Sequence, residues 1–156
     1  IKKTEVTELL QALQEASSKL KAPAVPKLLF IVVLKKIRTR FFATNASGAV
    51  GNPLPGTVVD TQVVSHAVQE FYLVCQHVNQ GSATPTKYQK IYDETNLTTD
   101  QIQMTTYGLS HVYFNWYGTV RVPSVLMYAS KLAKFIGLTT GGADVHESLH
   151  KQLHYL

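Results

Sequence analysis

The sequence is short of charge, of cysteine and of long apolar runs, and each shortage excludes a class of protein. Only 16% of its 156 residues are charged, where about a quarter is usual, so the chain has less solvated surface than a free-standing domain normally shows. A single cysteine, Cys75, excludes an internal disulfide and a cysteine-rich zinc site and is compatible with a reducing compartment. The longest apolar run, residues 28–34, is shorter than the roughly 20 residues that cross a bilayer. We therefore expect no membrane partner.

The residues that are present can build a core and can meet an anionic partner. Hydrophobic residues make up 45% of the chain and aromatic residues 10%, over a length of about one domain. Fifteen lysines and arginines against ten acidic residues give a net charge of +5 and a pI near 9.3. Such a balance allows a polyanionic partner without proving one.

The N-terminal half predicts a helix followed by strands. Apolar residues recur every three or four positions between Val6 and Leu20, and prolines in 22–26 end this helix. Residues 28–34 form a continuous, β-branched apolar run, which predicts a strand buried on both faces and an α/β architecture. A turn-rich loop is predicted over 43–56, followed by extended backbone at 58–59. The segment at 65–78 fits either a helix or a buried strand. A break at 80–86 and a half-buried strand at 88–92 follow it.

The C-terminal half predicts three helices. The first runs from about Thr98 to Phe114 and begins with a capping box of Thr98 and Gln101. The second begins at Pro123, a favoured first-turn residue, with Gly137 as its C-cap. A short final helix is expected over 144–154.

A block of four cations follows the apolar strand. Lys35, Lys36, Arg38 and Arg40 stand at its carboxyl end, where ligands gather in open α/β sheets. Lysine and arginine at such a place neutralise phosphates. The alternative is a solvated run of charge at a strand exit.

Other side chains that could carry chemistry have simpler structural interpretations. His146, His150 and His154 share one helix face, where an i, i+4 pair can hold a metal, but a solvated helix face explains them as well. Cys75 lies in an apolar run and reads as a packed thiol. No nucleophile elbow is present. Four carboxylates lie away from the outer faces of the predicted helices, and no two of them form a persuasive acid–base pair: Asp60, Asp93, Glu94 and Asp100.

Aromatic residues cluster beside a cation near the end of the predicted 98–114 helix. They are Tyr113, Phe114, Trp116 and Tyr117, and Arg121 follows them. Aromatic rings beside a cation can stack nucleic-acid bases. We interpret most of these aromatic side chains as filling the core around the end of the helix.

Five stretches and the chain ending resemble a known family in motif and order. They resemble the C-terminal part of the PIWI domain in the Piwi clade of Argonaute-family proteins, chiefly through Asn-Trp-x-Gly-x-x-Arg-Val-Pro (115–123) and Leu-x-x-x-Leu-x-Tyr-Leu (149–156). The stretches are 27–42, 52–60, 71–76, 85–88 and 113–123. The resemblance implies an α/β, ribonuclease H-like fold, with a mixed sheet flanked by helices. It also implies that residues 1–156 are the C-terminal portion of that domain, without the upstream PIWI half and the MID, PAZ and N-terminal regions.

The resemblance bears on catalysis through one position. The family is a metal-dependent ribonuclease, in which Mg²⁺ or Mn²⁺ is held by two aspartates, a glutamate and a histidine. The acidic members fall upstream of the matched region, and Asp60 is not one of them. Ser130 stands at the position of the histidine. A serine hydroxyl ligates weakly, so we expect weak or absent target cleavage even in the full-length protein.

The resemblance also implies a set of RNA-binding residues. Lys35, Lys36 and Arg40 match residues that meet guide phosphates. Leu156 would contribute its terminal carboxylate to a magnesium ion at the guide 5′ phosphate. Four residues match positions along the same path: Gln76, Gln80, Tyr113 and Arg121.

The expected function is therefore to hold a small guide RNA of the Piwi-interacting class (piRNA), for RNA-mediated silencing of transposons. Expected partners are the guide, complementary target RNA, the rest of the Piwi protein and silencing cofactor proteins, in cytoplasmic germ granules or in the nucleus. Two alternatives stay open: a guide-directed endonuclease, when joined to upstream aspartates, and a scaffold for protein interactions.

Overall fold

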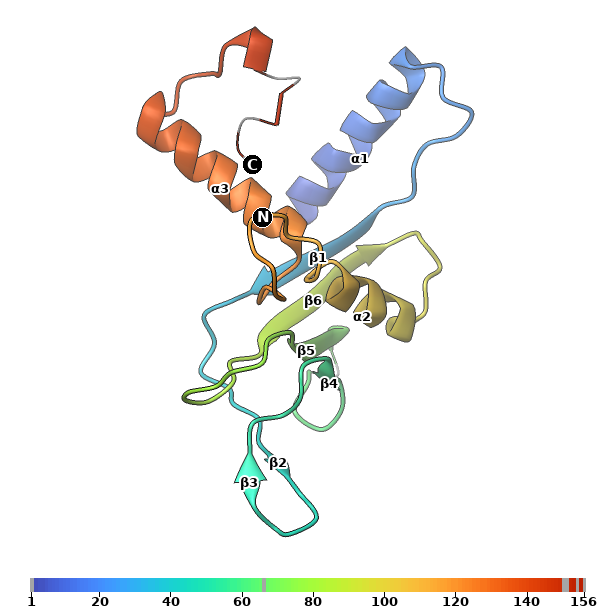
Figure 1. Cartoon of the computed structure of the whole chain (residues 1–156). Helices are drawn as coiled ribbons and strands as arrows, with labels where there is room; N and C mark the ends of the chain where they lie inside the picture. Colours follow the sequence, from blue (N-terminus) through green and yellow to red (C-terminus); the bar gives the residue numbers. More distant parts are fainter. Residues whose placement is uncertain (1, 66, 150–151, 154, 156) are drawn as a thin grey trace.

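The computed structural model describes residues 2–65, 67–149, 152, 153 and 155, and shows a sheet with helices on its two faces (Figure 1). Four strands lie in the order β1-β6-β5-β4, and a separate two-stranded hairpin projects below them (Figure 1). The elements are α1 (Lys2–Lys19), β1 (Leu29–Leu34), β2 (Ala43–Thr44), β3 (Val50–Gly51), β4 (Thr57–Val59), β5 (Glu70–Val74), β6 (Thr86–Asp93), α2 (Thr99–Gly108), α3 (Ser124–Thr139) and the short 3-10 helix η1 (Glu147–Leu149). The predicted α/β architecture is confirmed, and the strand pairs described are antiparallel.

The core lies between β5, β6 and α2. Phe71, Leu73 and Cys75 point to one face of the sheet, where they pack with Tyr88 of β6 and Ile102 of α2. The rings of Phe71 and Tyr88 stack with centroids 4.9 Å apart. All five residues of β5 are buried. The segment at 65–78, for which the sequence allowed either a helix or a strand, therefore contains a central strand.

The opposite face of β5 carries a buried carboxylate. Glu70 accepts hydrogen bonds from the Ser65 backbone N–H at 2.7 Å and from Gln89 Nε2 at 3.0 Å, and pairs with Lys87 Nζ at 2.9 Å. Burial raises the pKa of this carboxyl, but the bonds from Gln89, Lys87 and Ser65 outweigh it and lower the pKa to about 2. Glu70 therefore stays ionised and ties β5 to β6.

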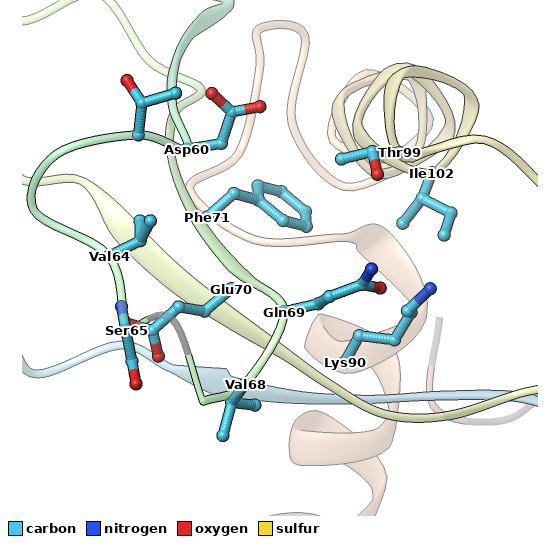
Figure 2. Close-up of a pocket in the computed structure, with 11 residues that line it drawn as sticks. Asp60, Val64, Ser65, Val68, Gln69, Glu70, Phe71, Lys90, Thr99 and Ile102 are labelled. Atoms are coloured by element: carbon cyan, nitrogen blue, oxygen red, sulfur yellow. The ribbon is translucent and has the colours of Figure 1, made fainter.

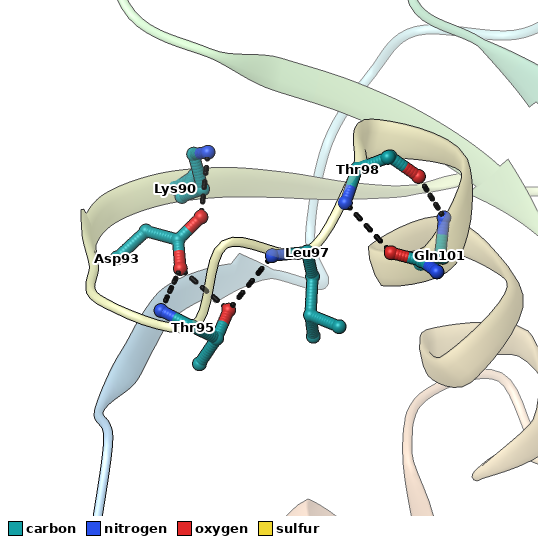
Figure 3. A network of polar contacts seen from close by, with 6 residues as sticks. All are labelled: Lys90, Asp93, Thr95, Leu97, Thr98 and Gln101. Atoms are coloured by element: carbon teal, nitrogen blue, oxygen red, sulfur yellow. Dashed lines mark hydrogen bonds and ion pairs between the residues drawn. The ribbon is translucent and has the colours of Figure 1, made fainter.

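A network of short polar contacts leads from β6 into α2 (Figure 3). Asp93 accepts hydrogen bonds from the backbone N–H and the hydroxyl of Thr95, at 2.8 and 2.6 Å, and pairs with Lys90 at 2.9 Å. The predicted capping box is confirmed: Thr98 Oγ1 accepts from the Gln101 N–H at 3.2 Å, and Gln101 Oε1 accepts from the Thr98 N–H at 2.9 Å. The helix thus starts where the sequence predicts.

Two predictions about the strands and loops need correction. Residues 29–33 of β1 are only half-buried and Leu34 is exposed, so the prediction of burial on both faces is wrong. The reason is position, since β1 lies at the edge of the sheet and pairs with β6 alone among the described strands. The turn-rich loop over 43–56 contains the hairpin of β2 and β3, whose turn is held by Asn45 Oδ1, a hydrogen-bond acceptor for Ser47 and Ala49.

Three predicted helix boundaries are also wrong. The helix expected over 98–114 ends at Gly108, because the chain turns at Leu109, where Ser110 donates to the Tyr107 carbonyl. Helix α3 continues through Gly137 to Thr139, whose hydroxyl donates to the Phe135 carbonyl. The helix expected over 144–154 is reduced, in the described residues, to η1. No helix of the described chain combines the length and the apolar character that a membrane span requires.

Candidate nucleic-acid interface

Several of the predicted RNA-binding residues lie at one end of the sheet. Strand register pairs Leu34 of β1 with Lys87 of β6, and Leu73 of β5 with Thr86 of β6. The end of β1, the end of β5 and the start of β6 therefore meet. Lys35 and Lys36 follow β1 there, Gln76 follows β5, and Gln80 lies in the connection from β5 to β6. We call this region the cationic end.

Carboxylates gather at the other end of the sheet. Asp93, at the end of β6, pairs with Leu29 at the start of β1, and Glu94 donates its N–H to the Leu28 carbonyl. Asp60 follows β4 and accepts a hydrogen bond from Gln103 at 2.8 Å. Hydrogen bonds from Thr95 and Lys90 lower the pKa of Asp93 to about 2. The two ends of the sheet thus differ in charge.

Lys35 and Lys36 of the cationic end, and Ser130 of α3, lie in two segments that contain no aspartate or glutamate, residues 16–59 and 101–143. The structure brings them together, because Lys35 Nζ donates to Ser130 Oγ of α3 at 3.5 Å across 95 positions of sequence. Both residues are exposed. Positive charge at this place is therefore not neutralised by a carboxylate from either segment, as a site for phosphates requires.

A loop between α2 and α3, residues 109–123, is fixed at its base on the cationic end. Two backbone bonds close it, from Val120 N–H to the Ser110 carbonyl and from Ser124 N–H to the Leu109 carbonyl, each at 2.9 Å. Two side chains of the sheet end hold residues 119–121 of this loop: Gln76 Nε2 donates to the Thr119 carbonyl at 2.6 Å, and Thr86 Oγ1 to the Arg121 carbonyl at 3.1 Å. The exposed side chain of Arg121 therefore belongs to the cationic end.

Aromatic residues in this loop divide into two groups. Tyr113 is half-buried, and its ring lies 5.0 Å from that of Tyr128 on α3, whose hydroxyl accepts from the Phe114 N–H at 2.8 Å. Phe114, Trp116 and Tyr117 are exposed. The expectation that most of these rings fill a core is wrong, because the helix ends before them and the loop carries them outward.

The remaining predicted residues are placed as follows. Lys36 and Gln80 are exposed. Arg40 Nη1 donates to the carbonyls of Ile37 and Thr39, at 3.0 and 2.7 Å, so its guanidinium folds back on its own loop. Leu156 lies outside the described residues.

Metal-binding side chains do not gather in the part of the chain that the structure describes. His146 Nδ1 contacts the Ser148 hydroxyl at 2.8 Å, while His150 and His154 lie outside the described residues. Ser130 has the Lys35 ammonium beside it, and a neutral hydroxyl next to a cation is a poor ligand for a divalent metal. The described residues therefore do not fit the metal-dependent role of a histidine at this position.

A pocket of ≈ 370 Å³ opens at the carboxylate end (Figure 2). Asp60, Ser65, Glu70, Lys90 and Thr99 are among the residues that line it. Glu70 is held by Ser65, Gln89 and Lys87, and Asp60 is held on one oxygen by Gln103. The pocket lies away from the cationic end and brings no nucleophile to a base.

The one cysteine is not a reactive group. Cys75 is 2% exposed, and burial raises the pKa of its thiol to about 11. A thiol in this state is protonated at neutral pH and does not act as a nucleophile. The prediction of a packed thiol is confirmed.

Sequence reasoning missed two features of this site. One is the exposure of the aromatic loop, which follows from the end of α2 at Gly108, before the aromatic residues. The two segments free of carboxylates are visible in the sequence, but their meeting at Lys35 and Ser130 depends on tertiary structure.

The chain is similar to a family of known proteins. A family model described as "Piwi domain" matches residues 1–140. The chain is 47% identical over 131 residues to Protein argonaute-3 of Drosophila melanogaster, covering 83% of this chain and 15% of that protein. It is 37% identical over 152 residues to Protein piwi of Drosophila melanogaster, covering 97% of this chain and 17% of that protein. The chain thus spans about a sixth of the length of these relatives.

Solved structures give the same result for the fold. The crystal structure of Drosophila Piwi superposes with a TM-score of 0.82 and 38% identity, covering 97% of this chain and 20% of that one. The Kluyveromyces polysporus Argonaute with a guide RNA superposes with a TM-score of 0.80 over 97% of this chain and 21% of that one. At 24% identity the second likeness bears on the fold alone.

Proposed function

This chain belongs to the Piwi domain family, and from that premise we propose that its cationic end holds the backbone of a small guide RNA. Its fold is the ribonuclease H-like fold of Argonaute PIWI lobes. The observation that carries the proposal is the placement of exposed Lys35, Lys36 and Arg121 at one end of the sheet, on two segments of sequence without carboxylates. Contacts from such cations to phosphate give affinity without sequence preference, as a protein that accepts many guides requires.

The finer assignment is that the guide belongs to the Piwi-interacting class and directs silencing of transposons through complementary target RNA. Support comes from the 37–47% identity to Protein piwi and Protein argonaute-3. The remainder of a Piwi protein and silencing cofactor proteins would be its partners, in germ granules or in the nucleus. A role as a docking scaffold for those cofactors stays the alternative.

The guide 5′ phosphate would be held by a magnesium ion together with the terminal carboxylate of Leu156. This part of the proposal depends on the resemblance of the chain ending alone, since Leu156 lies outside the described residues. The magnesium ion would supply positive charge to the phosphate.

Cleavage of the target is the rival function, and we expect it to be weak or absent. Ser130 is a poor substitute for a metal-binding histidine, and the Lys35 ammonium beside it adds repulsion toward a divalent ion. The check is to incubate the full-length protein with guide, target RNA and manganese. Robust cleavage that persists in Ser130→Ala would contradict this expectation.

The proposal is tested by removing charge at the cationic end of the full-length protein. Lys35→Gln with Lys36→Gln should weaken binding of a 5′-phosphorylated single-stranded RNA. Each lost phosphate contact should also lower the slope of log affinity against log salt by about 0.7. The measurement is a filter-binding titration at several salt concentrations.

Lys27 provides a matched control for this experiment. It is exposed and precedes β1, so it lies at the carboxylate end of the same strand. Lys27→Gln removes the same single charge as Lys35→Gln alone, which is the variant to compare it with, and should leave affinity and slope close to those of the unmodified protein. Equal losses from the two variants would mean that net charge, and not the cationic end, governs binding.

A further inference from the structure

The tip of the 109–123 loop exposes three aromatic rings. Phe114 is 85% exposed, Trp116 52% and Tyr117 97%. Side chains of this size usually contribute to stability by burial, and these leave half or more of their surface exposed. We call residues 114–117 the aromatic tip.

The rings of the aromatic tip are arranged and not merely exposed. Trp116 and Tyr117 stack, with centroids 4.9 Å apart and planes inclined by 26°. A Cβ added to Gly118 would come within 3.0 Å of Trp116 Nε1, so the indole lies against bare backbone. The backbone N–H of Trp116 donates to the Tyr113 carbonyl at 3.2 Å.

The base of the loop holds the aromatic tip in place. Gln76 and Thr86 of the sheet end donate to carbonyls of residues 119 and 121, and the Tyr128 hydroxyl of α3 accepts from the Phe114 N–H. Because the loop is already held in this way, binding a ligand there costs less conformational entropy than ordering a free loop would.

The charge around the aromatic tip selects between two kinds of partner. The tip lies within residues 101–143, which contain no carboxylate, and Arg121 follows it on the same loop. An apolar protein surface would match the rings but would leave Arg121 unpaired. A nucleic-acid strand matches both, because its bases stack on aromatic faces and its phosphates meet cations.

We propose that Trp116 and Tyr117 stack with an unpaired base of the RNA strand whose phosphates lie on the cationic end. The inference rests on the proposed function and deepens it by assigning a base contact where only backbone contacts were expected. Stacking of this kind tolerates any base, since every base has an aromatic face. Arg121 would hold the adjoining phosphate.

The test uses the full-length protein and a 5′-phosphorylated single-stranded RNA of fixed sequence. A second set of RNAs carries one abasic nucleotide at each position in turn. Trp116→Ala should weaken binding of the intact RNA by about 5- to 150-fold, the range measured for loss of one stacked base. At one position the abasic RNA should lose the same factor with the unmodified protein and nothing further with Trp116→Ala.

Control variants separate stacking from damage to the loop. Trp116→Phe keeps an aromatic face and should retain most of the affinity, whereas Gly118→Ala should displace the indole and lose part of it. Met104→Ala removes an exposed apolar side chain from α2, away from the loop, and should leave RNA affinity unchanged.

The outcomes distinguish this inference from the proposed function. If the Lys35 and Lys36 variants weaken binding and Trp116→Ala does not, the stacking site is refuted and the backbone site stands. If neither variant weakens binding, both are refuted. Trp116→Ala that binds every RNA normally but loses a silencing protein would replace the stacking site with a protein-docking surface.

Discussion

Glu70 shows how a single side chain couples the two central strands to pH. Its side chain is 2% exposed and is bound by Lys87, Gln89 and the Ser65 N–H. The pKa of the folded carboxyl is about 2, below the ordinary 4.5. A depressed pKa means that the stabilisation is complete above pH 4.5 and is lost as the pH falls toward 2.

We therefore predict an acid-sensitive contact between β5 and β6 that Glu70→Gln removes. The variant should open these strands more readily at pH 7, by about 1 kcal/mol, the ordinary contribution of a hydrogen bond. It should also flatten the loss of stability between pH 4.5 and 2. Hydrogen exchange of β5 amides in the full-length protein measures both effects. An acid dependence that is the same in both proteins would show that other carboxylates are responsible.

Individual site residues were predictable to different degrees. Lys35 and Lys36 could be predicted, because a cation directly after a strand can only lie at that strand's end. The hydrogen bond from the Gln76 side chain to the Thr119 carbonyl could not be predicted, since it joins positions 43 residues apart. The exposure of Trp116 was predicted wrongly, because an apolar side chain is assigned to a core unless the backbone path is known.

At the scale of elements, α2 depends on its first turn. The capping box of Thr98 and Gln101 satisfies backbone N–H groups that the helix itself leaves free. Thr98→Ala should lower the free energy of opening α2 by about 1 kcal/mol. The measurement is the hydrogen exchange of α2 amides in the full-length protein.

Thr99 supplies the control for the α2 prediction. It is the next residue, is exposed and lies inside the helix instead of capping it. Thr99→Ala should change the opening free energy by less than about 0.5 kcal/mol. Equal effects of the two substitutions would mean that the capping bonds do not stabilise α2.

The local sequence pattern predicted most helices and strands, but it did not predict where the helices end or how deeply the strands are buried. Strand β6 alternates and was predicted, and the cap of α2 has a recognisable motif. The end of α2 at Gly108 was missed because apolar spacing continues through Val112 and Tyr113 after the helix stops. The half-burial of β1 was missed because a run of apolar residues does not say whether its strand is central or at an edge.

At the scale of the whole molecule, the structure leaves apolar surface open. A groove of ≈ 400 Å³ runs between β1, α2 and α3, lined by side chains such as Ile31, Val33, Leu109 and Leu126. The edge of β1 beside it has no partner among the described strands. Open apolar surface and an unpaired strand edge both favour association.

We accordingly predict that these 156 residues expressed alone are poorly soluble or molten. They should bind the dye ANS (8-anilinonaphthalene-1-sulfonate), unfold without a sharp thermal transition and give a poorly dispersed spectrum. Light scattering, dye fluorescence and two-dimensional NMR measure these properties. A monomer with a cooperative transition and a dispersed spectrum would contradict the prediction.

The separation of charge between the two ends of the sheet gives the molecule an electric dipole along its strands. A polyanion is turned by that dipole before it touches the protein, so a larger share of collisions reaches the cationic end in a productive orientation. Salt weakens such guidance by screening it over about 10 Å. Added salt should therefore slow the association of RNA with the protein and also weaken the contacts between the cations and the phosphates. The lifetime of a base contact at the aromatic tip should depend far less on salt.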